Sequence, residues 1–387
     1  MAKLGEVFPV IRNGVSIKQE SGAGGFPITR IETISNRTVN RSKMGYAGIL
    51  DIGKYQDYIL QDGDILMSHI NSEAHLGKVA LYAKQGNEQI IHGMNLLMLR
   101  SNSKKLLPEY AKCYFESWSF LRQIQRITKK SVNQASFTVT ALKEVEIPCV
   151  DIDVQKEIVK RLQKLEQLIS LRKQQLVKLD DLVKARFVEM FGEPRSNPSG
   201  FDKKPLKSTC KVITGNTPSR SESENYGDFI EWIKTDNIIA GLLNPTSAVE
   251  KLSEEGAKRG KIVHKGAILM ACIAGSVASI GRVCVTDRTV AFNQQINAIV
   301  SEKYNVIFLY ILLQMSKDYL VEDVNLSLKG ILSKSKLEDK EFIIPPLSLQ
   351  NDFAAFVERV DQQKQTVQQS LDKLELMKKA LMQEYFG

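Results

Sequence analysis

A long internal repeat is the feature that most constrains how this 387-residue chain folds. Residues 155–192 align without a gap onto residues 350–387, at an offset of 195 residues, and eleven of the 38 aligned positions are identical. The copies end on identical pairs, Phe191 with Phe386 and Gly192 with Gly387. The chain is also longer than one typical domain of roughly 150 residues. The repeat therefore predicts two similar halves rather than one core.

Each copy carries apolar residues at alternating spacings of four and three, eight of them among ten positions. The two series are Ile158, Leu162, Leu165, Ile169, Arg172, Leu176, Leu179, Val183, Arg186, Met190, and Phe353, Val357, Val360, Lys364, Val367, Leu371, Leu374, Lys378, Leu381, Tyr385. This spacing is typical of a coiled-coil seam. No Pro or Gly interrupts residues 155–191, which predicts one helix of about 36 residues, about 54 Å long. An amphipathic helix lying on a globular core is the alternative for one copy, but two copies favour pairing of the helices with each other.

The segments between the long helices also resemble each other. In each half a glycine-led apolar run, a polar stretch and a second glycine-led run read as strand, loop and strand, followed by a helix-like apolar stretch. These segments are 63–67, 77–81 and 108–127 in the first half, and 266–270, 281–285 and 306–321 in the second.

Proline marks the entry to each long helix, at Ile147-Pro148 and Ile344-Pro345, because proline cannot continue a strand ladder. Two prolines and two glycines in residues 192–200 break the chain after the first helix. We therefore expect an α/β (α+β) chain with a pseudo-two-fold internal repeat. Its four parts are a first globular domain at 1–146, a central helix at 147–192, a second globular domain at 193–343 and a C-terminal helix at 344–387.

Composition excludes several classes of protein. Hydrophobic residues make up 43% and charged residues 25%, which is typical of a folded globular chain. No run approaches 18 consecutive apolar residues, and the first residues lack the apolar run of a signal peptide, so we expect a soluble cytoplasmic protein. The five cysteines form no CxxC and the four histidines no HxxxH, which argues against a structural zinc site.

Charge is unevenly distributed along the chain. The formal net charge is +9, and residues 1–150 carry 19 basic and 13 acidic side chains. Such an excess suits a polyanionic partner without requiring one.

Catalytic and cofactor motifs are not apparent. The string Gly256-Ala-Lys-Arg-Gly260-Lys261 has the wrong spacing for a phosphate-binding loop, and no GxGxxG follows a strand. Residues 338–340, Glu-Asp-Lys, match a short nuclease element, but no acidic strand precedes them. We therefore expect no catalytic residues, no metal and no cofactor.

Polar loops rich in Arg, Lys, Asn and Gln are the candidates for chemistry. Arg and Lys bond guanine and phosphate, and Asn and Gln bond adenine, although a solvated surface loop has the same composition. The candidate DNA-binding residues are Arg30, Arg37, Arg41, Lys43, Lys129, Lys130, Asn133, Gln134, Asn216, Thr217, Ser219, Arg220 and Lys234.

Two motifs resemble a known family, the specificity (S) subunits of type I restriction-modification systems. Residues 213–219, Ile-Thr-Gly-Asn-Thr-Pro-Ser, with Tyr226 and the Ile-Glu-Trp-Ile run at 230–233, are similar to the opening of their target-recognition domains. Residues 343–350, Ile-Ile-Pro-Pro-Leu-Ser-Leu-Gln, resemble the entry to their spacer helices. The first half departs from the pattern, with Arg-Asn-Gly-Val-Ser-Ile at residues 12–17.

The resemblance implies a non-catalytic DNA-binding subunit. Each globular target-recognition domain would read one half of a split double-stranded DNA target, and the helices would form an antiparallel coiled coil between them. Type I methyltransferase (M) subunits, which use S-adenosylmethionine, would dock on the helices, and a motor-nuclease (R) subunit would join for cleavage; no membrane is involved. Apolar residues off the seam are the candidates for docking, namely Leu168, Leu182, Leu376 and Met377. A coiled-coil scaffold without DNA recognition and a nuclease or methyltransferase are the alternatives.

Overall fold

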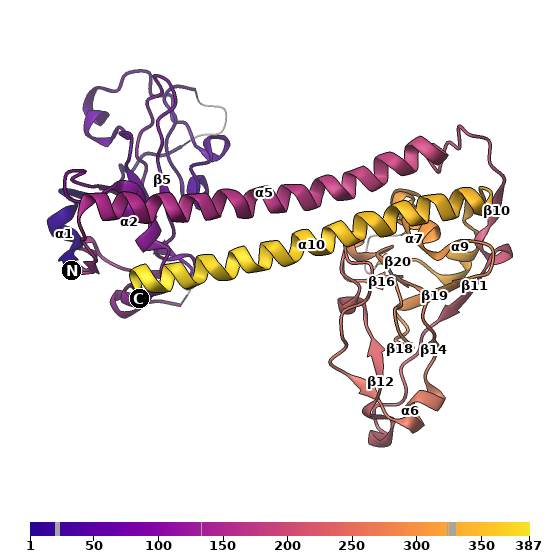
Figure 1. Cartoon of the computed structure of the whole chain (residues 1–387). Coiled ribbons are helices and arrows are strands. Elements are labelled where there is room, and N and C mark those ends of the chain that lie inside the picture. The colour runs from indigo at the N-terminus through magenta and orange to yellow at the C-terminus, as the bar shows by residue number, and fades with distance from the viewer. Residues whose placement is uncertain (20–23, 133, 323, 325–329) are drawn as a thin grey trace. The chain divides into compact units, whose positions relative to one another are not determined.

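The computed structural model describes residues 1–19, 24–132, 134–322, 324 and 330–387 (Figure 1). The chain divides into two compact units. Unit 1 comprises Met1–Arg172 with Ser370–Gly387, and unit 2 comprises Lys173–Gln369.

Two helices of 40 residues, α5 (Ile152–Phe191) and α10 (Leu347–Phe386), contribute one half each to both units. In unit 1, Lys378 Nζ of α10 donates to Glu166 Oε1 of α5 at 2.7 Å. In unit 2, Lys364 Nζ donates to Asp180 Oδ1 at 2.7 Å. The beginning of each helix thus pairs with the end of the other, which confirms the antiparallel coiled coil. The predicted seam is buried or half-buried along both helices.

A four-stranded antiparallel sheet of the same topology recurs in each unit, and it contains the strand pairs expected after the paired glycines. Unit 1 has the order β2 (Val10–Asn13), β6 (Leu96–Arg100), β3 (Ile65–Ser68), β5 (Val79–Leu81). Unit 2 has the order β11 (Cys210–Thr214), β19 (Ile296–Ser301), β15 (Ile268–Ala271), β17 (Val283–Val285).

Paired helices follow each of these sheets, as the apolar stretches predicted. They are α2 (Pro108–Phe115) and α3 (Trp118–Ile127) in unit 1, and α7 (Val306–Met315) and α8 (Lys317–Val321) in unit 2. Shorter helices are α1 (Leu4–Val7), α4 (Val139–Lys143), α6 (Glu254–Arg259) and α9 (Lys334–Asp339).

Small sheets complete both units. Unit 1 pairs β1 (Ala2–Lys3) with β9 (Glu146–Ile147), and β4 (Ile70–Asn71), β8 (Ala135–Ser136) and β7 (Lys129–Lys130) in that order. Unit 2 pairs β10 (Lys203–Pro205) with β21 (Glu341–Ile343), and β16 (Ile273–Ala274) with β20 (Gly330–Ile331). Unit 2 also has a four-stranded sheet, in the order β13 (Lys251–Leu252), β12 (Tyr226–Ile233), β18 (Val290–Phe292), β14 (Ile262–Val263). At the corresponding place unit 1 has isolated β-bridges, such as the one between Ile28 and Ile91.

A glutamine that is identical in the two helix copies joins the start of each helix to the unit in which that helix begins. Buried Gln155 accepts a hydrogen bond from Leu107 N, the N-cap of α2, at 2.9 Å. Gln350 likewise accepts from Asn305 N, the N-cap of α7, at 2.9 Å. The two interactions satisfy helix N-termini that lack an intrahelical partner.

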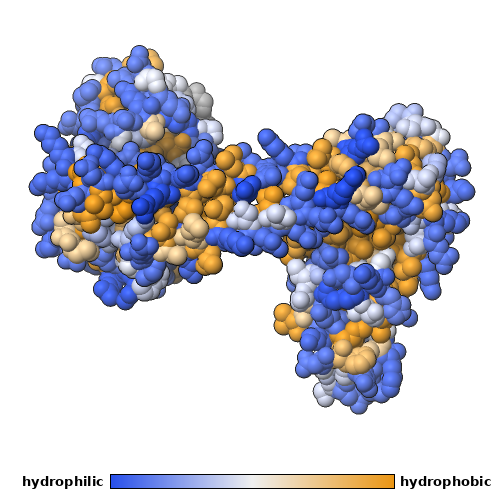
Figure 2. All heavy atoms as spheres, in the orientation of Figure 1, coloured by the Kyte–Doolittle hydropathy of each residue, from blue (hydrophilic) through white to orange (hydrophobic). Residues whose placement is uncertain are grey.

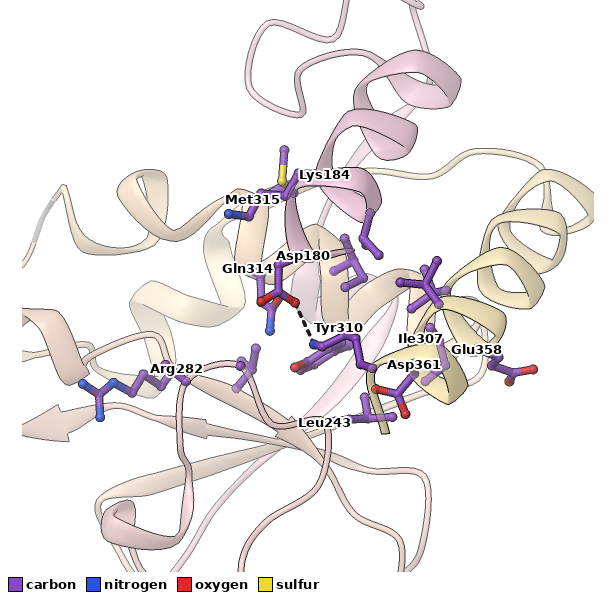
Figure 3. A pocket seen from close by; sticks show the side chains of 18 of the residues that line it. Asp180, Lys184, Leu243, Arg282, Ile307, Tyr310, Gln314, Met315, Glu358 and Asp361 are labelled. Atoms are coloured by element: carbon purple, nitrogen blue, oxygen red, sulfur yellow. Dashed lines mark hydrogen bonds and ion pairs between the residues drawn. The ribbon is translucent and has the colours of Figure 1, made fainter. Parts of the chain in front are cut away.

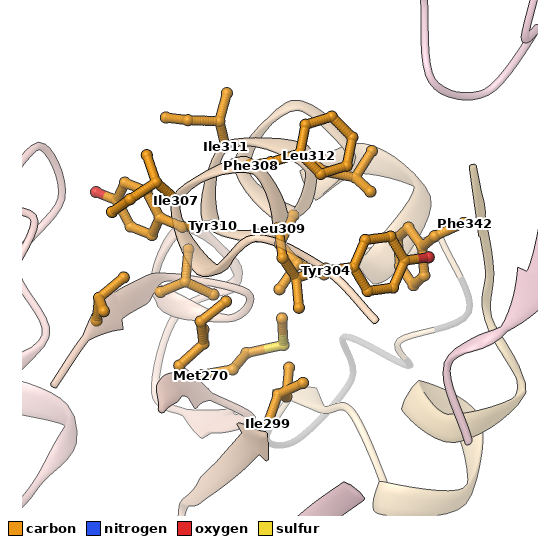
Figure 4. Packing of buried hydrophobic residues seen from close by; sticks show 14 of the residues in the cluster. Met270, Ile299, Tyr304, Ile307, Phe308, Leu309, Tyr310, Ile311, Leu312 and Phe342 are labelled. Carbon is orange, nitrogen blue, oxygen red and sulfur yellow. The ribbon is translucent and has the colours of Figure 1, made fainter. Parts of the chain in front are cut away.

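Aromatic packing holds the other end of each helix. Phe191 lies 4.8 Å from Phe308 of α7 between ring centroids, and Phe386 lies 5.4 Å from Tyr110 of α2. Figure 4 shows α7 packing Phe308 and its neighbours in the unit 2 core, where Met270 and Ile299 of the sheet also lie. Both terminal phenylalanines of the repeat are therefore core residues.

Unit 1 also buries His92, and neither of its ring nitrogens has a hydrogen-bond partner in the described part of the chain. Burial lowers the pKa of His92 to about 4. In the unfolded chain the imidazole of His92 has its ordinary pKa of about 6.5. The unfolded state therefore binds a proton that the folded state does not, and the free energy of unfolding falls as the pH drops from about 6.5 towards 4. The loss amounts to about 3 kcal/mol. Buried His69 also has a pKa lowered to about 4, with the same sign.

We predict that His92→Phe reduces this acid sensitivity. Phe292 occupies the same place in unit 2, because Phe292 O accepts from Asn216 N at 3.2 Å as His92 O accepts from Val15 N at 2.9 Å. Hydrogen exchange of the β6 amides between pH 7 and 4.5 measures the local stability. The variant should lose less protection than the native chain, whereas His75→Gln, at an exposed histidine, should behave like the native chain. Equal losses in both variants would contradict this assignment.

Candidate nucleic-acid interface

The loop after β11 in unit 2 is held in place by hydrogen bonds from the aromatic residues of the family-like motif. Tyr226 Oη donates to Pro218 O at 2.8 Å, and Trp232 Nε1 donates to Asn216 O at 3.3 Å. The side chain of Asn216 donates to Arg259 O at 2.8 Å and accepts from Lys261 N at 2.7 Å. The aromatic motif residues thus hold the loop, and the Asn216 amide is engaged in the same scaffold.

Beyond this pinned segment the loop presents polar side chains. Thr217 is exposed and its hydroxyl donates to Gln294 Oε1. Ser219 is exposed, with its hydroxyl 2.7 Å from Ser221 Oγ.

Arg220 and Lys234 share one carboxylate, that of Glu250. Arg220 Nη2 lies 2.9 Å from Glu250 Oε2, and Lys234 Nζ lies 2.8 Å from Glu250 Oε1. Hydrogen bonds from Lys234 and then Arg220 lower the pKa of Glu250, so this carboxylate is ionised at neutral pH. Both cations also lie over the Trp232 ring, at 5.7 and 5.1 Å from its centroid. This Arg220–Glu250–Lys234 cluster is a charged, partly exposed surface built on an aromatic base.

Arg41, predicted to bind DNA, forms an internal ion pair in unit 1. Its Nε donates to Glu88 Oε2 at 2.8 Å, and its Nη2 donates to Ala83 O at 2.9 Å. The hydrogen bond from Arg41 lowers the pKa of Glu88 to about 2. The sequence gives little sign of this pair, because its members are 47 residues apart.

The other unit 1 candidates differ in their contacts. Arg30 is exposed, and its Nε donates to Gln19 Oε1. Arg37 has a positive φ of 59° and its Nη1 lies 3.8 Å from Glu116 Oε1. Lys43 is exposed.

Lys129 and Lys130 of the basic segment form β7, which pairs with β8 (Ala135–Ser136). Lys129 and Lys130 are exposed, and Lys130 Nζ lies 2.9 Å from Glu73 Oε1. Gln134 is exposed, and its backbone oxygen accepts from Ser131 N at 2.8 Å. Asn133 lies outside the described residues.

Sequence reasoning missed Gln19 and Glu250. Glu250 is 30 residues from Arg220, and an acidic residue is not a usual candidate for a DNA-binding surface. The only available signal was the position of both residues near basic loops.

The apolar residues proposed for partner docking are accessible to different degrees. Leu182, Leu376 and Met377 are 47%, 68% and 52% exposed, whereas Leu168 is half-buried. Figure 2 shows that hydrophobic residues lie among hydrophilic ones on the visible face.

Two hollows adjoin the helices within unit 2. A groove of about 1040 Å³ is lined by Leu182, Met190 and Phe356 among others. A pocket of about 620 Å³ lies among α5, α7 and α10, where Asp180 accepts from Lys364 (Figure 3). Tyr310 and Ile307 of α7 line this pocket.

Among the residues that the structure describes, no group of three or more His, Cys, Asp or Glu is placed to hold a metal ion. Within the same ranges, no helix is both long and apolar enough to span a membrane.

Comparisons with known proteins place this geometry in a family. The family described as type I restriction modification DNA specificity domain matches residues 1–180 and 198–376. The putative type I restriction enzyme MjaX specificity subunit of Methanocaldococcus jannaschii is 29% identical over 98% of this chain and 91% of its own length.

Two solved structures share the fold. A chain from work on complex assembly and conformational transition of the type I R-M system has a TM-score of 0.61 at 17% identity, with 100% of this chain and 96% of that chain covered. The type I restriction-modification S subunit from M. genitalium has a TM-score of 0.57 at 13% identity, with 100% and 95% covered. Because the family match extends over most of both units and into both long helices, the chain belongs to the type I restriction-modification DNA specificity family and carries two copies of its domain.

Proposed function

We propose that this DNA specificity protein is the non-catalytic recognition subunit of a type I restriction-modification complex, in which each globular domain reads one half of a bipartite target. The observation that carries the proposal is the recurrence of one sheet-and-helix topology in two units, each built on one half of the same two helices. Two similar readers suit duplex DNA, whose half-sites recur along one face about every 34–36 Å.

The proposed readers correspond to residues 1–146 and 193–343, with the helical parts at 147–192 and 344–387. Exposed side chains on their loops supply both kinds of contact that DNA recognition needs. Lys43, Lys129 and Lys130 suit phosphates, and Arg30 and Arg220 suit guanine edges. Phosphate contacts would supply affinity and register, and base-edge contacts would supply the sequence preference.

The helices are proposed to dock methyltransferase subunits, with a motor-nuclease subunit joining for cleavage inside the cell. Leu182 and Met377 support this assignment, because they occupy equivalent positions of the repeat and both expose apolar side chains. Two equivalent surfaces suit two copies of one partner. The groove beside Leu182 offers apolar and charged lining together, as helix-binding surfaces do.

Replacing residues 193–342 by the corresponding segment of a relative tests the division between readers. Sequencing of methylated sites in cells that express the chain with its methyltransferase partners should show one half of the target changed and the other half retained. The reason is that each reader makes its base contacts separately. A change in both halves, or in neither, contradicts the two-reader proposal.

Charge placed on the docking surface should prevent assembly. We predict that Leu182→Glu combined with Met377→Glu abolishes co-purification with a methyltransferase subunit, because the carboxylates would have to be desolvated in the interface. Val249→Glu, at an apolar residue that is 99% exposed and lies outside the helices, is the control and should leave assembly intact. Normal assembly of the double variant would contradict the docking assignment.

Lengthening both helices tests whether they set the gap between half-sites. Four helix-forming residues inserted between Leu165 and Leu176, and four between Val360 and Leu371, lengthen each helix by about 6 Å and turn it by about 400°. The seam then returns nearly to its original face. The gap in the methylated target should grow by about one to two base pairs, at roughly 3.4 Å each, with the half-site sequences unchanged. An active variant with an unaltered gap would show that the helices do not measure it.

A further inference from the structure

One backbone hydrogen bond that recurs in both readers identifies equivalent positions on their loops. Val15 N donates to His92 O at 2.9 Å in unit 1, and Asn216 N donates to Phe292 O at 3.2 Å in unit 2. Four residues after these donors, the chain reaches Gln19 in unit 1 and Arg220 in unit 2.

A second pair of backbone hydrogen bonds aligns the neighbouring strand. Ile28 N donates to Gly45 O at 2.8 Å, and Trp232 N donates to Glu250 O at 3.1 Å. Gly45 therefore occupies the position of Glu250.

The same alignment places Arg30 where unit 2 has Lys234, two residues after each donor. Both then donate a backbone hydrogen bond to the side chain three residues on, Arg30 to Thr33 at 2.8 Å and Lys234 to Asn237 at 3.0 Å. Positions 19, 30 and 45 of unit 1 thus correspond to 220, 234 and 250 of unit 2.

Side chains at these positions contact one another in both units, but the type of contact differs. In unit 1, Arg30 Nε donates to Gln19 Oε1, and a Cβ added at Gly45 would overlap both of these atoms. In unit 2 the carboxylate of Glu250 binds both Arg220 and Lys234. Each reader therefore brings its three positions together with its own chemistry.

We propose that these equivalent positions are specificity-determining in both readers, with Gln19 and Arg30 facing the first half-site and Arg220, Lys234 and Glu250 facing the second. This inference rests on the proposed function and names the residues that act in it. Arg donates to guanine, Gln bonds adenine, and a carboxylate accepts from the cytosine amino group.

Glu250 acts on the second half-site in two further ways. Its charge repels phosphates, which limits sequence-independent binding by the neighbouring cations. It also holds both cations in one arrangement before DNA arrives, so that less side-chain freedom is lost on binding. Arg220 and Lys234 remain 60% and 31% exposed in this arrangement, so they stay accessible to DNA.

The test converts the unit 2 positions to those of unit 1, in the full chain expressed with its methyltransferase partners. The variant combines Arg220→Gln, Lys234→Arg and Glu250→Gly, which leaves the net charge unchanged. The control combines Lys207→Gln with Asp339→Asn, which removes an exposed ion pair of 2.6 Å from the same unit and also leaves the net charge unchanged. Methylated sites are sequenced, and co-purification with the partners confirms that each variant is folded.

The triple variant should methylate targets altered in the second half-site only, or lose methylation while still assembling, whereas the control should keep the native target. A triple variant that keeps the native target overturns the inference but leaves the two-reader proposal standing. Absence of any bipartite target for the native chain with its partners overturns both.

Binding of the full chain to a duplex of random sequence provides a second measurement that does not depend on the glycine substitution. Glu250→Gln should steepen the slope of log affinity against log salt by about one to two, because released cations reach phosphates. Asp339→Asn changes the net charge equally and should leave the slope nearly unchanged. Equal slopes for the two variants would overturn the role given to Glu250.

Discussion

Burial of the apolar seam between two long helices is the interaction on which the rest of this protein depends. Most helix stability in proteins comes from burial of an apolar face rather than from the helix alone. Here α5 buries its seam against α10, and the two ends of each helix belong to different units. Every turn of the seam therefore contributes to a unit, and neither unit is complete without residues distant in the sequence.

The two units repeat the side-chain contacts of the helical scaffold, but they do not repeat the side chains of the loops. Gln155 and Gln350 each accept a hydrogen bond from the N-cap of the preceding core helix, and Phe191 and Phe386 fill equivalent aromatic sites. By contrast, the loops keep their backbone pairing while the side chains change. This division is what a reader requires, because backbone hydrogen bonds fix the geometry without specifying the side chains that project from it.

Features encoded over short stretches were predictable from the sequence. The seam of α5 and α10, the glycine-led strands and the apolar helices follow from local periodicity and turn chemistry, and the structure confirms them. The contacts of Arg41 with Glu88, and of Arg220 with Glu250, join residues that only the fold brings together. A basic residue can be recognised in a sequence, but its acidic partner cannot, and the partner decides how much of its charge is offered to DNA.

Charge within the seam favours pairing of α5 with α10 over pairing of α5 with a second α5, although the two helices are repeats. Position 183 of α5 is equivalent to Lys378, and position 169 to Lys364, but both are apolar in α5. If α5 paired with another α5 in the same register, Glu166 would face Val183 in place of a lysine. It would then keep only its longer contact with Lys112 Nζ, at 3.9 Å, and a partly desolvated carboxylate with a weaker counter-ion is less favourable. Pairing of α10 with another α10 would instead place Lys378 opposite Asp361, an acceptable arrangement. The charge pattern therefore discriminates against one of the two like-with-like pairings, and the intrachain pairing of α5 with α10 satisfies all four charges.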